Sequence, residues 1–333
     1  MPVSETTNNP NESAVRGENT LSRILAWVVG ALVPLALAAC ATPPQTARLL
    51  DAPPGALPRR AEVANVPFYP QEKYYCGPAA LAMVVTWSGL PVTQDDMAPQ
   101  VYMPGREGTL QSDVLAAARR NGRLAVPVGS LDDLLAEIAA GHPVLVFQNL
   151  GLSWYPQWHY AVALGYDLDA GNLVLHSGLE RRYVTPLPTF ERTWERGGYW
   201  ALVVLPPDAL PATADEPTAV LRAATGLEQA GRFDEAAAAY TAIADRWPAS
   251  LGAWMGLGNV RYADDDLAGA EEAFRTATLR RPDAGAAWNN LAHVLGERGR
   301  RTEALEAAQR AVDLGGAGAE TYRATLGEVS SRQ

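Results

Sequence analysis

The last third of the chain repeats itself every 34 residues, and this period restricts its fold more than any other feature. A period of this length indicates a helical hairpin that buries only half of its apolar face, so a neighbour displaced by one period must cover the rest. The aromatic residues of the pattern are therefore predicted to lie in a core and not around a cofactor. The matched positions are Trp254 and Trp288, Pro248 and Pro282, Tyr240 and Phe274, and Ala236, Ala270 and Ala304.

This pattern resembles the tetratricopeptide repeat. It predicts an all-α solenoid over residues 217–333, with a capping helix that ends near Ser331. The middle repeat fits the family best, and the outer two depart from it at Val220, where tryptophan is usual, and at Gly316, where proline is usual. Terminal repeats of a solenoid are often atypical. The resemblance implies a concave face that binds a peptide or a partner protein. The three predicted repeats span residues 217–250, 251–284 and 285–318.

The composition indicates a globular protein and argues against a nucleic-acid partner. Apolar residues make up 48% of the 333 residues, which is enough for the cores of two domains. The formal net charge is -10, from 27 basic and 37 acidic residues. Such a charge disfavours nucleic acid, and the sequence offers no polybasic patch for a membrane surface.

The N-terminal segment has the pattern of an export signal. Arg16 and Arg23 precede an apolar run over residues 24–39. A run of roughly 16 residues is short of the ~20 that a membrane-spanning helix needs. The run ends in Leu37-Ala38-Ala39-Cys40, which resembles the lipobox of bacterial lipoproteins. The resemblance implies that residues 1–39 are a signal peptide and that the sulfur of Cys40 carries a lipid.

Residues 40–60 are proline-rich and aperiodic, and they are predicted to be a tether between this anchor and a folded body. Ala41 follows the lipidated cysteine in place of aspartate. In bacteria that use an aspartate retention signal, this favours the outer membrane, with the protein on its periplasmic face.

The first domain is predicted over residues 61–207, and a proline-rich linker follows over residues 208–216. Predicted helices come first, and the third of them begins at Ser130, with Asp133 placed as in a capping box. Predicted strands follow. This order favours an α+β domain, with helices packed on an antiparallel sheet, over alternating βαβ units. The predicted helices are 77–88, 110–120 and 130–141, and the strands are 143–148, 159–166, 173–176 and 199–205.

One stretch of this domain, QEKYYCGPAA at residues 71–80, contains the only cysteine besides Cys40. With Cys40 acylated, Cys76 has no partner for an internal disulfide, so it is either an inert buried residue or a reactive thiol. The N-terminus of a helix favours a thiolate through its dipole. Its free N–H groups, together with the amide of Gln71, can stabilise the oxyanion of an acyl intermediate.

Such chemistry also needs a general base, and His159 is the best placed of the four histidines. His142 lies in a turn before a strand, His176 ends a short strand, and His293 lies inside a repeat helix. His159 opens a strand of alternating small apolar residues, from which its ring can project towards a helix end. Alone, a strand histidine is more often structural.

Two motifs of this domain together resemble the papain-like cysteine peptidases of the bacteriocin-processing, double-glycine type. The first is Q-x4-C-G-P, which opens an Ala-rich helix, and the second is H-Y-A-V-A-L-G-Y-D, about 80 residues later. The resemblance covers about residues 61–207. It implies that Cys76 is the nucleophile, that His159 is the general base and then the acid, and that Gln71 donates to the oxyanion.

The sequence departs from this family at the third member of the triad. The family usually has an aspartate at the end of the strand that follows the histidine strand, and Ser177 occupies this place. Either the Ser177 hydroxyl or a backbone carbonyl is expected to orient the imidazole. Asp167 and Asp169 are nearer to His159 in the sequence, but solvated acids in a hairpin turn are the simpler interpretation.

The hypothesis is therefore an envelope-anchored cysteine peptidase that hydrolyses peptide bonds and binds a protein substrate or partner through its repeats. The alternative is a catalytically idle, peptidase-like lipoprotein that acts as a binding scaffold. A third hypothesis keeps the acyl chemistry of the cysteine but makes the enzyme an amide-forming transferase or a non-proteolytic amidase. None of these needs a metal or another cofactor, and no histidine or cysteine cluster has ligand spacing.

Overall fold

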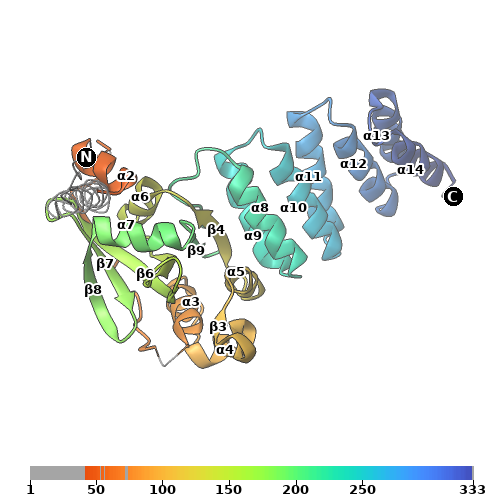
Figure 1. Cartoon of the computed structure of the whole chain (residues 1–333). Coiled ribbons are helices and arrows are strands. Elements are labelled where there is room, and N and C mark those ends of the chain that lie inside the picture. The colour runs from red at the N-terminus through yellow and green to blue at the C-terminus, as the bar shows by residue number, and fades with distance from the viewer. Residues whose placement is uncertain (1–41, 53, 56, 72–73, 332–333) are drawn as a thin grey trace, which may run out of the picture.

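The computed structural model describes residues 42–52, 54–55, 57–71 and 74–331. A sheet domain (residues 44–205) is followed by a row of helices, the repeat domain (residues 218–331), which extends away from it (Figure 1). The sheet domain contains α2 (Pro44–Asp51), β1 (Arg60–Glu62), α3 (Cys76–Trp87), α4 (Gln94–Val101), β2 (Tyr102–Met103), β3 (Gly108–Thr109), α5 (Gln111–Arg120), β4 (Leu124–Val128), α6 (Leu131–Ala139), β5 (Val144–Asn149), β6 (Trp158–Asp167), β7 (Asn172–Ser177), β8 (Glu180–Pro186), α7 (Leu187–Arg196) and β9 (Ala201–Leu205).

The main sheet is antiparallel throughout, in the order β4-β9-β5-β6-β7-β8, and β1 pairs with β6. The predicted α+β class is confirmed. The four predicted strands correspond to β5, β6, β7 and β9, and the capping interaction at α6 is present, because Ser130 accepts the N–H of Asp133. The sequence pattern missed β8, which is nearly all exposed and lacks an apolar alternation.

Helix α3 forms the centre of the sheet domain. Nine of its twelve residues are buried, so the helix is enclosed on all sides, and it packs against β6. A helix of this kind has its position set by the core around it. Its first residue, Cys76, therefore lies at the edge of the core and is half-buried.

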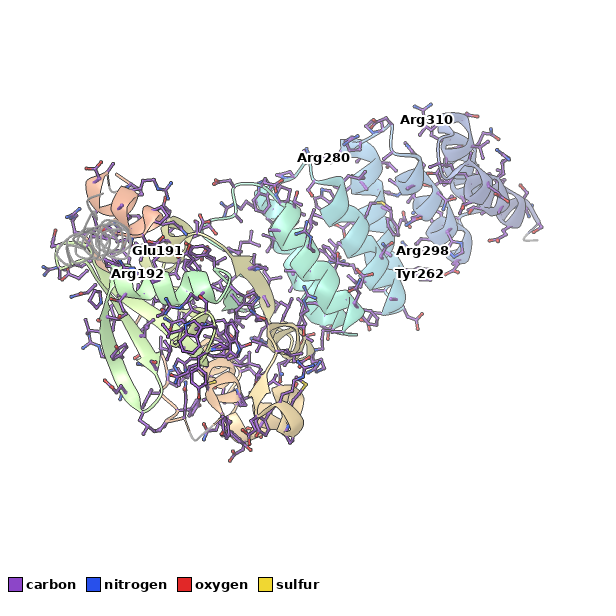
Figure 2. The ribbon with its side chains drawn as sticks, viewed as in Figure 1. Glu191, Arg192, Tyr262, Arg280, Arg298 and Arg310 are labelled. Atoms are coloured by element: carbon purple, nitrogen blue, oxygen red, sulfur yellow. The ribbon has the colours of Figure 1, made fainter. Side chains whose placement is uncertain are left out.

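The expectation of an aperiodic tether over residues 40–60 is wrong for residues 44–51, which form α2 and pack against α6 and α7. Glu191 of α7 is fully buried and accepts the backbone N–H groups of Gln45 (3.0 Å) and Thr46 (2.6 Å) (Figure 2). A distant carboxylate thus supplies the N-terminal hydrogen bonds of this helix, which no local residue pattern could predict. Cys40 and the rest of the predicted signal segment lie outside the described residues.

The repeat domain matches the predicted period. Each of the three repeats is a helical hairpin, and α14 covers the end of the row. Small residues allow the aromatic side chains to pack, because a Cβ atom at Gly256 would collide with Tyr240 and one at Gly258 would collide with Phe274. The helices are α8 (Thr218–Gln229), α9 (Phe233–Arg246), α10 (Leu251–Ala263), α11 (Leu267–Arg280), α12 (Gly285–Glu297), α13 (Arg301–Leu314) and α14 (Ala319–Ser331).

The first repeat packs directly on the sheet domain. Helix α8 lies against β4 and α5, and its buried residues belong to the same hydrophobic core as the sheet. A Cβ atom at Gly226 of α8 would collide with the side chain of Arg119. The predicted linker is also held in place, because the buried carboxylate of Glu137 accepts the N–H groups of Ala212 (3.2 Å) and Thr213 (2.9 Å). Among the described residues, no helix has the length and apolar character needed to cross a bilayer.

Replacement of Glu191 by alanine should release α2. The change leaves the N–H groups of Gln45 and Thr46 without acceptors, so we expect a loss of about 2–4 kcal/mol in the free energy of unfolding, measured by chemical denaturation. Limited proteolysis should cut near α2 before the rest of the domain. Glu195→Ala removes an exposed carboxylate from the same helix and should leave both results nearly unchanged. Equal behaviour of the two variants would contradict this role of Glu191.

Candidate active site

Gln71, Cys76 and His159 line one cavity of about 900 Å³. Its walls come from the start of α3, from β3 and the loop before it, from the start of β6, and from Gly197 and Gly198 after α7. The fold thus brings together the three residues that the sequence singled out, although two of them are about 80 positions apart. Within the described part of the chain, no group of three His, Cys, Asp or Glu side chains is arranged to hold a metal ion.

The sulfur of Cys76 lies beside the start of β6. Backbone groups of Tyr160, Gly77 and Cys76 itself hydrogen-bond it. Tyr160 directly follows His159, so the sulfur and the backbone of His159 lie at the same end of β6. The residue before α3, Tyr75, makes no side-chain cap, which leaves the N–H groups of the first turn available to the site.

Burial raises the pKa of the Cys76 thiol above its ordinary value of 9.0, and the backbone hydrogen bonds only partly oppose this rise. The sequence-based expectation was a favoured thiolate, from the helix dipole. The structure gives the opposite direction, because the thiolate would lose more hydration energy at the edge of the core than the nearby N–H groups return.

The imidazole of His159 is held by Ser177, since its Nε2 lies 2.9 Å from the Ser177 Oγ. Ser177 therefore occupies the position that the sequence suggested for it. Burial lowers the pKa of His159 to about 4. An uncharged hydroxyl gives the imidazolium no Coulombic support, so the ring stays neutral at neutral pH. Because Nε2 makes the hydrogen bond to Ser177, this bond does not occupy Nδ1.

Gln71 is buried and fixed by three hydrogen bonds. Its Nε2 donates to the carbonyl of Tyr160 (3.4 Å), and its Oε1 accepts the N–H of Gly178 (3.2 Å). Its own backbone N–H donates to the Gly178 carbonyl (3.1 Å). The amide thus joins β6 to the turn after Ser177, and the second hydrogen on Nε2 is left for a group in the cavity.

Gly77 is required by the close approach of β3. A Cβ atom on Gly77 would collide with the side chain of Thr109. The backbone carbonyl of Thr109 also accepts a hydrogen bond from the Tyr160 hydroxyl (3.2 Å). The short hairpin of β2 and β3 closes one wall of the cavity over the first turn of α3. Sequence reasoning missed this wall, because two-residue strands leave no periodic signal.

The other candidates lie in structural roles. The Nδ1 of His142 is 2.7 Å from the buried carboxylate of Glu137, and the Nε2 of His176 is 3.3 Å from the carbonyl of Val66. Asp167 accepts two N–H groups of its own turn and pairs with an exposed arginine, which confirms the interpretation of solvated turn acids.

The rate at which iodoacetamide alkylates Cys76 should rise with pH through the alkaline range, without a plateau between pH 4 and pH 9. The raised thiol pKa keeps the thiolate fraction small at neutral pH, and the rate should grow about tenfold per pH unit. Mass spectrometry of the labelled Cys76 peptide measures this rate.

The variant Ser177→Asp provides the contrast. A carboxylate beside His159 should raise the imidazole pKa and stabilise a thiolate–imidazolium pair, so that Cys76 reacts at least about tenfold faster at pH 7. A plateau near pH 6 in the wild-type profile would show that the charged pair already exists.

Comparisons with known proteins agree with this division of the chain. A sequence model of the Peptidase_C39 like family matches residues 63–202, and one of the tetratricopeptide repeat matches residues 221–278 and 261–319. No curated protein sequence matches the chain.

Many solved structures are similar to parts of the chain, among them the following three. One, described as a C39-like peptidase from Bacillus anthracis, is 19% identical with a TM-score of 0.38, and covers 44% of this chain and 97% of its own. The type III secretion translocator chaperone SycD of Yersinia enterocolitica is 16% identical with a TM-score of 0.33. The match covers 35% of this chain and 86% of SycD. YrrB, described as a TPR protein with an unusual peptide-binding site, is 22% identical with a TM-score of 0.32. The match covers 35% of this chain and 60% of YrrB. From the matched segments, the chain joins a domain of the Peptidase_C39 like family to C-terminal tetratricopeptide repeats.

Proposed function

We propose that this protein is a cysteine peptidase that hydrolyses peptide bonds by a Cys-His mechanism. The position of the Cys76 sulfur carries the proposal. It contacts the backbone of Tyr160 beside His159, on a cavity that Gln71 also lines. An inert core cysteine needs neither a cavity nor a histidine held in one orientation.

The neutral resting state suits a proton transfer that accompanies the attack. With Nε2–H donating to Ser177, Nδ1 of His159 takes the thiol proton while the sulfur bonds to the carbonyl carbon of the substrate. The carbonyl electron pair moves to oxygen, where the N–H of Cys76 and the amide of Gln71 stabilise it. His159 then protonates the leaving amine. Water, activated by His159, hydrolyses the thioester and restores the thiol.

The idle scaffold stays the second candidate, and two observations favour it. The position of the third triad member holds the uncharged Ser177, and burial raises the pKa of the Cys76 thiol. Both make the thiol less reactive at rest.

Catalysis is tested by digestion of a proteome-derived peptide library, with the products identified by mass spectrometry. Cys76→Ala should abolish cleavage, and His159→Ala should lower its rate at least about 10³-fold. Gln71→Ala should lower it about 10²-fold, as expected for the loss of one oxyanion donor. Gln229→Ala, at an exposed glutamine in α8, is the matched control and should retain the wild-type rate.

The scaffold would be supported instead if the wild-type chain cleaves no peptide of this library. Iodoacetamide labelling does not separate the two candidates, because the neutral resting state leaves the thiolate fraction of Cys76 small in both.

We also infer that the repeats bind a peptide segment of a substrate or partner. A second cavity, of about 400 Å³, lies between α10, α12 and α14. Asn290 donates to Asn259 across it (3.2 Å), and the Oδ1 of Asn289 is buried without a hydrogen-bond partner among the described residues. Tyr262, which is labelled in Figure 2, lines the same cavity. Side-chain amides offer both a donor and an acceptor to a peptide backbone.

We further propose that the protein is held at the bacterial cell envelope by a lipid on Cys40, on the periplasmic face of the outer membrane. The apolar run and the residues Leu37 to Cys40 support this. Only three residues separate Cys40 from α2, so the anchor would hold the sheet domain within about 15 Å of the lipid.

The anchor is tested by metabolic labelling of the full chain with radioactive palmitate. We expect label on the wild type and on Cys76→Ser, the matched control, and no label on Cys40→Ser, because the thioether to the lipid forms only at residue 40. Label that persists in Cys40→Ser would refute the anchor.

A further inference from the structure

The hairpin that joins β5 to β6 exposes large apolar side chains beside the catalytic cavity. Scattered exposed apolar residues are ordinary, but five within nine positions form a patch, and such patches mark binding surfaces. The exposed fractions are 48% for Leu150, 54% for Leu152, 81% for Trp154, 65% for Tyr155 and 54% for Trp158.

This hairpin is an ordered structure, because the backbone pairing of the two strands continues to its tip. The N–H of Leu150 donates to the Gln157 carbonyl (2.9 Å). Leu152 and Tyr155 exchange two backbone hydrogen bonds, both of 3.1 Å. The apolar side chains are therefore presented in fixed positions, which lowers the entropy that binding would cost.

Two polar side chains hold the base of the hairpin. The Oδ1 of Asn149 accepts the N–H groups of Gly151 (3.0 Å) and Gln157 (2.8 Å). The guanidinium of Arg196, at the end of α7, donates twice to the Asn149 carbonyl (3.2 and 3.0 Å). Arg196 also lines the catalytic cavity, so one side chain connects the cavity wall to the hairpin.

The register places three of the apolar residues on the strand face of His159. Gln148 pairs with His159, and the pairs Leu150–Gln157 and Leu152–Tyr155 continue the same register. Because side chains alternate along a strand, Leu150, Leu152 and Tyr155 share the face of His159. At ~3.3 Å per residue, this face extends about 13 Å from the histidine, which is the length of four residues of an extended peptide.

The opposite strand face also reaches the cavity, which His159 lines from its own face. Trp158 stacks on Phe147 with ring centroids 5.2 Å apart, and both residues line the cavity. Trp158 therefore belongs both to the exposed patch and to the cavity wall, and the patch is continuous with the cavity through this residue. This continuity favours a peptide substrate over a lipid bilayer as the group that covers the hairpin.

We propose that the hairpin of residues 149–158 is a substrate-binding surface that takes apolar side chains located within about four residues of the scissile bond. This inference rests on the proposed peptidase function. Tryptophan and tyrosine dominate the affinity of many peptide interfaces because they bury a large area with few rotatable bonds, and the hairpin presents both at its tip.

The test is a selection from a phage library of random 12-residue peptides on the full chain carrying Cys76→Ala. We expect the selected peptides to be rich in Leu, Ile, Phe and Trp. Their affinity, measured by fluorescence anisotropy, should fall at least about tenfold in Leu152→Ser and in Tyr155→Ser. Leu279→Ser replaces a leucine of α11 that is 78% exposed and is the matched control, for which we expect no change in affinity.

Selected peptides without apolar enrichment, or with equal affinity for the hairpin variants, would overturn the proposal. So would a loss of binding to phosphatidylcholine–phosphatidylglycerol vesicles in the hairpin variants with unchanged peptide affinity, because the hairpin would then be a membrane surface. Melting temperatures equal to that of the parent chain show that the variants are folded. Selection measures binding alone, so a wild-type chain that cleaves no peptide refutes the peptidase function separately.

Discussion

The enclosure of α3 on all sides is the constraint on which the site depends. Nine buried residues fix this helix against β6, so the position of Cys76 follows from core packing and not from a local cap. Gly77 extends the same constraint, because its missing side chain lets Thr109 approach and close one wall of the cavity. Tight packing at the first turn therefore produces both the place of the thiol and the shape of the cavity around it.

The same burial acts on both reactive groups and keeps them neutral. It raises the pKa of the Cys76 thiol and lowers the pKa of His159 to about 4, while Ser177 adds no charge to oppose either shift. In the proposed mechanism, charge separates only when a substrate carbonyl and its oxyanion donors are present. A neutral thiol also reacts slowly with oxidants and other electrophiles, which would suit the location at the cell envelope that we propose.

The sequence could predict those features that neighbouring residues determine. The 34-residue period, the Ser130 cap and the order of the cysteine and histidine elements all depend on local patterns, and the structure contains them. Features that depend on distant contacts were missed. Helix α2 is held by Glu191, which lies 145 positions after Thr46, and the sign of the Cys76 pKa shift depends on how deeply the core encloses the sulfur. No residue next to α2 or to Cys76 carries this information.

The contact between the two domains gives the repeats a fixed place relative to the active site. Helix α8 shares the core of the sheet domain, Arg119 fills the space over Gly226, and Glu137 holds residues 212 and 213. A flexible linker would raise only the local concentration of a substrate bound to the repeats. A rigid connection also sets the distance that the substrate chain must span. For a polypeptide that occupies both the repeat groove and the β5–β6 hairpin, the fold would therefore select the separation between its two binding segments as well as their composition.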